Sequence, residues 1–216
     1  MPVSSWLHRR FDLLVPVWLG GIAVVVDVLR FRYGLPWIGW VNMAAVWWLA
    51  HQAGFFHERL TRASRPLPWA LLYGGLFAMV GLVFSGLYPG SMVGVPGDRL
   101  SNIGPPTLVV VALLTFQVGL AEVTRPAVER LLRRPRARQA TALVNRFALP
   151  LFLFHSTGMA LARTIFYLGF AGRIVDDRDP DLVWWLERPL AILGPLLCTL
   201  PVIALFSLRR GAKRHP

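Results

Sequence analysis

The sequence predicts an all-α, polytopic integral membrane protein: a bundle of about six transmembrane helices with both termini in the cytoplasm. Of its 216 residues, 55% are hydrophobic and only 16% are charged, with a mean hydropathy of +0.52. Soluble domains carry about 25% charged residues, so a water-exposed globule is excluded. Long apolar runs and the distribution of arginine between them complete the argument.

Six apolar segments approach the length of a membrane-spanning helix, which is about 20 residues for a hydrocarbon core about 30 Å thick. Proline and glycine turns and clusters of charge separate them, as expected at helix ends. We expect the whole chain to form one transmembrane domain, and the single cysteine excludes an intramolecular disulfide. The expected spans are residues 13–29, 35–55, 68–88, 107–123, 148–170 and 189–208.

The orientation follows from the basic residues, of which 22 are arginine and one is lysine. Sixteen of the 23 lie before the first span, after the second and fourth spans, or at the C-terminus, and six lie in the alternate loops. The positive-inside rule therefore places both termini in the cytoplasm. We expect a multi-pass protein of a bacterial cell membrane, with anionic lipids at its cytoplasmic loops. Nucleic acid is not an expected partner, because the arginines are divided among four membrane-flanking segments.

Ionisable and amide side chains inside the spans are candidate functional residues, since burying them in lipid is costly. His155 lies about 12 Å along the fifth span, and Gln117 lies at about the same depth in the fourth span. A hydrogen bond between the two would be either a structural contact between helices or part of a cavity that holds a substrate or cofactor.

Two more charges lie in the outer halves of spans, Asp27 in the first and Arg163 in the fifth. They form a buried ion pair, or Arg163 extends alone to the interface, or Arg163 anchors an anionic substrate group. Glu122, near the cytoplasmic end of the fourth span, is predicted to pair with a nearby arginine. No cluster of cysteine and histidine has metal-ligand spacing, so no metal site is expected.

Several stretches together resemble the membrane-bound acyltransferase 3 family, in the version common in actinobacteria. The likeness covers nearly the whole chain but matches only the C-terminal half of the family's ten-helix domain, and its outer-loop stretch is the most specific. The stretches are residues 24–31 (VVVDVLRF), 38–52 (IGWVNMAAVWWLAHQ), 88–108 (YPGSMVGVPGDRLSNIGPPTL), 117–120 (QVGL) and 148–155 (ALPLFLFH, with Phe154 in place of the family's tryptophan).

The resemblance implies acyl transfer from a cytoplasmic thioester donor, acyl-CoA, to a hydroxyl of a sugar or lipid-linked acceptor, with no bound cofactor. His155 would act as the base, Gln117 would orient it, and Arg163 would hold a phosphate or carboxylate. The family's arginine–histidine pair has no match here, so we expect a truncated enzyme or one that depends on a separate N-terminal half. The alternative is a non-enzymatic subunit, or a transport or assembly protein, in which these residues and Asp27 only join helices.

Overall fold

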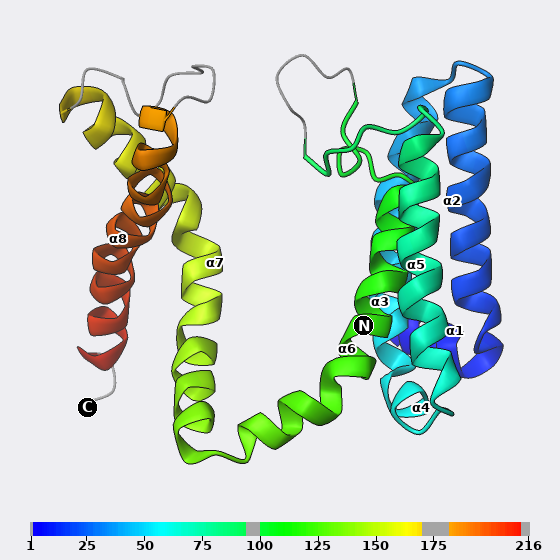
Figure 1. Cartoon of the computed structure of the whole chain (residues 1–216), viewed down its shortest axis with the longest axis horizontal. Helices are drawn as coiled ribbons and strands as arrows, with labels where there is room; N and C mark the ends of the chain where they lie inside the picture. Colours follow the sequence, from blue (N-terminus) through cyan, green and yellow to red (C-terminus); the bar gives the residue numbers. More distant parts are fainter. Residues whose placement is uncertain (1, 94–99, 170–181, 213–216) are drawn as a thin grey trace. The chain divides into compact units, whose positions relative to one another are not determined.

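The computed structural model describes residues 2–93, 100–169 and 182–212, and the chain is 84% helical, with no strand in these ranges. It divides into two compact units, Met1–Arg130 and Leu131–Pro216, and each is described by itself (Figure 1). The first unit holds α1 (Pro2–Phe11), α2 (Leu14–Arg32), the 3-10 helix η1 (Pro36–Trp40), α3 (Val41–Phe55), α4 (His57–Thr61), α5 (Pro66–Phe84) and most of α6 (Leu108–Leu132).

Five helices within the described residues are long and apolar enough to cross a membrane. They are α2, α5 and α6, followed by α7 (Pro135–Gly169) and the Trp185–Ala204 part of α8 (Leu182–Ala212) in the second unit. Many of their large apolar side chains are exposed, which suits lipid and not water as the surroundings. The helical, multi-pass membrane architecture predicted from the sequence is therefore confirmed.

The second expected span, residues 35–55, is not one continuous α-helix. It begins with η1 and continues as α3, whose 15 residues rise about 22 Å, less than the thickness of the hydrocarbon core. Pro36 is the first residue of η1, and a proline disfavours the helical conformation of the residue before it; Leu35 has φ −104° and ψ 74°, which is not helical. The helical segment therefore begins at Pro36.

The fourth and fifth spans continue as helix well beyond their predicted ends. α6 runs past residue 123 to Leu132, and α7 begins at Pro135 and not at residue 148. The arginine-rich segment between the spans is thus mostly helical, because arginine, leucine and alanine favour helix and proline fits the first helical turn. A helix need not end where its apolar segment ends.

In the second unit, α7 packs against α8 through two glycines. A Cβ on Gly158 would overlap the hydroxyl of Thr199, and a Cβ on Gly194 would overlap the ring of Phe166. Small residues at such crossings let helix backbones approach closely. Ala162 is buried in the same contact.

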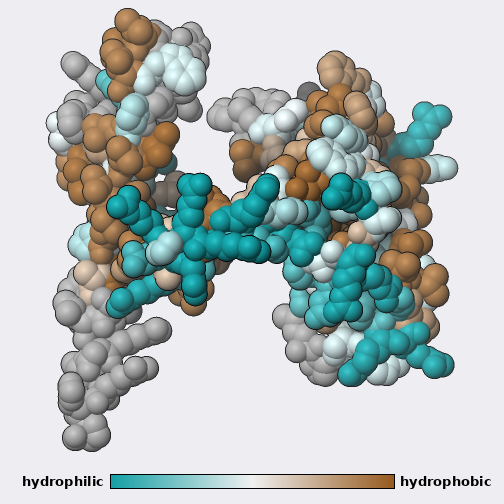
Figure 2. Space-filling view, turned by 60° about the horizontal axis from the view of Figure 1, so that its bottom comes forward, coloured by the Kyte–Doolittle hydropathy of each residue, from teal (hydrophilic) through white to brown (hydrophobic). Residues whose placement is uncertain are grey.

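The core of the first unit lies between α2 and α3, where Val15, Leu19, Ala45 and Leu49 are buried together. Helix α1 packs beside them, because Ser4 accepts hydrogen bonds from side chains of α3. The end of this unit that is drawn at the bottom of Figure 1 is turned toward the viewer in Figure 2. Hydrophilic side chains gather over this end. We call it the arginine-rich end, where Arg59, Arg62, Arg65 and Arg125 lie around α4, the start of α5 and the later part of α6.

Candidate functional site

A buried polar cluster surrounds Asp27 at the other end of the first unit. Asp27 is 2% exposed, and its Oδ1 accepts a hydrogen bond of 3.0 Å from Nδ2 of Asn42. Its Oδ2 accepts two more, of 3.1 Å from the hydroxyl of Tyr88 and 2.8 Å from the backbone N–H of Leu108. Leu108 begins α6, so the carboxylate lies at a helix N-terminus, where negative charge is favourable. We call these four residues the Asp27 cluster.

Tyr88 serves the Asp27 cluster as a hydrogen-bond donor. Burial raises the pKa of its hydroxyl above the ordinary value, and the neighbouring Asp27 carboxylate raises it further. The phenol therefore stays protonated at physiological pH, and its hydrogen bond to Asp27 persists.

Asn102 forms hydrogen bonds that hold together the segment between α5 and α6. The Asn102 amide donates hydrogen bonds of 2.7 Å and 2.8 Å to the carbonyls of Pro89 and Ser91, and its oxygen accepts one of 2.9 Å from the Thr107 hydroxyl. Asn102 and Thr107 are both buried. The described parts of the segment between α5 and α6 are therefore held together by hydrogen bonds. Asn102 and Thr107 were not identified as site residues from the sequence. Asn42, which is a single amide side chain in an apolar run, was not identified either.

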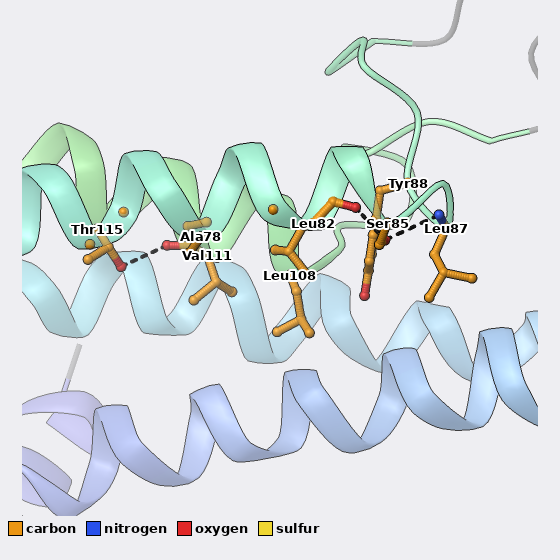
Figure 3. A pocket seen from close by; sticks show the side chains of 12 residues that line it. Ala78, Leu82, Ser85, Leu87, Tyr88, Leu108, Val111 and Thr115 are labelled. Atoms are coloured by element: carbon orange, nitrogen blue, oxygen red, sulfur yellow. Dashed lines mark hydrogen bonds between the residues drawn. The ribbon is translucent and has the colours of Figure 1, made fainter.

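A groove of about 580 Å³ lies between α5 and α6 in the first unit (Figure 3). Thr115 lies at one end, and Ser85, Leu87 and Tyr88 lie at the other, with the side chains of α6 between them. The hydroxyls of Thr115 and Ser85 bond to carbonyls of their own helices, so the wall is almost entirely apolar. Its volume is that of a small-molecule site. Its other lining residues are Gly74, Gly75, Ala78, Gly81, Leu82, Leu108, Val111 and Ala112.

At the arginine-rich end, Glu122 joins α6 to the segment that contains α4. Its side chain is 6% exposed, and its Oε1 lies 3.2 Å from Nδ1 of His57. Its Oε2 lies 3.2 Å from Nε of Arg125, as an ion pair and not as a well-directed hydrogen bond. Arg125 also donates a hydrogen bond of 3.0 Å to the carbonyl of Thr61. The predicted pairing of Glu122 with an arginine is confirmed.

The remaining predicted site residues are exposed within their own units. Gln117 lies on α6 of the first unit, and His155 and Arg163 lie on α7 of the second. His155 Nδ1 is 2.5 Å from the carbonyl oxygen of Phe152, a contact within its own helix. The contacts expected between His155 and Gln117, and between Arg163 and Asp27, would each join the two units, and both stay predictions.

The described residues include no group of three or more histidine, cysteine, aspartate or glutamate side chains that could hold a metal ion. The chemistry that this part of the chain offers is therefore that of an apolar groove, a buried carboxylate and an arginine-rich end. Comparison with known proteins adds no relationship: no protein-family model, no curated protein and no solved structure matches the sequence.

Proposed function

We propose that the chain is a membrane O-acyltransferase, or the C-terminal half of one, that transfers an acyl group from cytoplasmic acyl-CoA to a hydroxyl of a lipid-linked acceptor. In this proposal η1 and α3 together form a sixth span, and both termini and the arginine-rich end face the cytoplasm of a bacterial cell. His155 is the proposed base, with Gln117 and Arg163 beside the acceptor.

The observation that carries the proposal is the groove between α5 and α6. Its apolar wall suits the hydrocarbon tail of a lipid-linked acceptor, because the hydroxyls of Ser85 and Thr115 are bonded to backbone carbonyls and that of Tyr88 is bonded to Asp27. Tyr88 and Ser85 lie at one end of the groove, beside the Asp27 cluster. The stretch that most resembles acyltransferases starts at Tyr88 and ends at Leu108, and both residues line the groove.

The test is to fill the groove without disturbing the bundle. A Cβ at Gly81 has nothing within 4 Å, so Gly81→Leu places its side chain in the groove and leaves the helix contacts intact. Gly20→Leu is the matched control, because Gly20 is equally open but lies on α2, outside the groove. Acyl transfer from labelled acyl-CoA to extracted lipid is measured in native membranes, where any separate N-terminal half is present. We expect at least a tenfold loss for Gly81→Leu alone; equal rates for the two variants would refute the proposal.

A second candidate, a non-enzymatic membrane subunit, is favoured by one observation: the carboxylate of Asp27 and the ring of His155 both have bonding partners in their own units. His155→Gln separates the two functions in the same transfer assay. Thr157→Ser is the control, because the hydroxyl of the adjacent Ser156 lies 3.4 Å from Nε2 of His155. An enzyme that uses His155 as its base loses about 10²- to 10⁴-fold in rate. A subunit that only holds helices together loses little activity relative to its abundance in the membrane.

A further inference from the structure

Two cavities adjoin at the arginine-rich end of the first unit, and they differ in character. One, of about 390 Å³, is apolar and is lined from α2, α3, α4, α5 and α6 by side chains that include Leu49, Leu60, Leu71 and Leu114. The other, of about 530 Å³, is the more polar of the two; we call it the polar cavity, and it is lined by Phe55, Glu58, Arg59, Arg62 and Ala63. Arg59 and Ala63 line both cavities, so an apolar chain and a polar head can be accommodated side by side.

Arg59 is held at the junction of the two cavities. Its Nη1 donates hydrogen bonds of 3.0 Å and 2.8 Å to the two carboxylate oxygens of Asp12, and its guanidinium lies 5.4 Å from the centre of the Phe56 ring. Both bonds come from Nη1, and Nε and Nη2 have no hydrogen-bond partner in the described part of the chain. A positioned guanidinium with free donors is suited to a phosphate group.

The charges around the polar cavity are also favourable for an anion. Arg62 is paired with Glu58 at 3.5 Å, but both side chains are more than four-fifths exposed, so the pair contributes little and is easily rearranged. Arg65 follows closely and is exposed just before α5. Two arginines, Arg59 and Arg62, thus line this cavity together with one carboxylate, that of Glu58.

We propose that the two cavities form a binding site for an anionic phospholipid, with one acyl chain in the apolar cavity and its phosphate on Arg59. A bilayer lipid is the chosen occupant because three of the helices that line the apolar cavity, α2, α5 and α6, are long and apolar enough to cross a membrane. The bilayer around these helices provides lipid acyl chains, and anionic lipid headgroups concentrate near arginine-rich protein segments at the membrane surface. The proposal is independent of acyl transfer.

Lipid binding to the purified full chain in detergent tests the proposal. Phosphatidylglycerol and phosphatidylcholine with identical chains are titrated in parallel, and bound lipids are counted by native mass spectrometry. We expect phosphatidylglycerol to bind more tightly, and Arg59→Gln to weaken it about fivefold, the effect of losing one arginine–phosphate contact. Arg32→Gln is the matched control, because it removes the same charge from an exposed site at the other end of α2.

A second variant separates lipid binding from the structural bond of Arg59. Asp12→Asn weakens the hold on Arg59 but keeps the arginine, and asparagine tolerates the positive φ of 46° at this position. Phosphatidylglycerol affinity should be unchanged or higher in Asp12→Asn; a loss equal to that of Arg59→Gln would overturn the proposal. Equal binding of the two lipids, or displacement of phosphatidylglycerol by a soluble acyl thioester at equal concentration, would also overturn it.

Discussion

Oδ2 of Asp27 accepts a hydrogen bond of 2.8 Å from the backbone N–H of Leu108, which lies 81 positions later in the chain. One carboxylate in α2 thereby fixes the start of α6, and through Asn42 it also binds α3. Three helices thus meet at a single side chain. Asp27 therefore has a structural role in the first unit: its hydrogen bonds hold α2, α3 and the start of α6 together.

Replacing Asp27 with alanine should destabilise the protein strongly. The Asn42 amide and the Leu108 N–H would lose their acceptor in a buried environment, at a cost of about 1–3 kcal/mol for each group. Tyr88→Phe removes a single hydrogen bond and should cost about 1 kcal/mol. The thermal unfolding midpoint in detergent measures both. A midpoint for Asp27→Ala no lower than that of Tyr88→Phe would contradict the structural role.

Adjacent glycines on α5 should respond oppositely to the same substitution. A Cβ on Gly75 would overlap the backbone of Phe116, whereas a Cβ on Gly74 has nothing within 4 Å. Gly75→Ala should therefore push α5 from α6 and cost about 1–3 kcal/mol, the usual cost of overpacking. Gly74→Ala should be neutral or stabilising by up to about 1 kcal/mol, because alanine favours helix.

The two glycine variants are compared by thermal unfolding of the purified chain under identical conditions. The comparison is direct, because the substitutions are chemically identical and lie on the same helix one residue apart. Equal shifts of the midpoint would mean that α5 and α6 do not cross at Gly75.

Neutralising Glu122 should loosen the arginine-rich end. Glu122→Gln keeps the shape of a buried side chain but removes the charge that faces Arg125 and His57, and we expect a loss of about 2 kcal/mol. Glu129→Gln is the control: it lies 3.7 Å from the same arginine but is 57% exposed, so its loss should stay below about 0.5 kcal/mol. Urea unfolding of the two variants distinguishes them, and similar losses would argue against a buried ion pair.

The sequence predicted features that depend on local composition. Apolar runs located the membrane helices because lipid burial demands length and hydropathy, and Glu122 was paired correctly because its partner lies one helical turn away. Asp27 was noticed as a carboxylate in an apolar run. Its partners were not, because Asn42, Tyr88 and Leu108 meet it only through packing between distant segments.

Helix bounds and helix neighbours were harder to predict, because hydropathy alone does not determine them. The sequence did not predict that the second span begins with a 3-10 helix, because a run of apolar residues hides the effect of Pro36 on the backbone. The sequence also did not predict that α6 and α7 continue beyond their apolar segments, because the charged residues were taken as loop although arginine favours helix. The contact between His155 and Gln117 stays a prediction that rests on matching depths, and depth does not determine which helices are neighbours.

The orientation of the first unit can be tested with two cysteines that flank α5. Ser64 and Val93 are exposed on either side of this helix, whose 19 residues include no charged side chain, so we expect a single membrane crossing between them. In a Cys198→Ser background, a membrane-impermeant maleimide should label Val93→Cys on intact cells and Ser64→Cys only after permeabilisation. The reason is that Ser64 lies among Arg59, Arg62 and Arg65, and arginine is retained on the cytoplasmic side. Labelling of both cysteines from outside would mean that α5 does not cross the membrane, and the reverse pattern would place the arginine-rich end outside the cell.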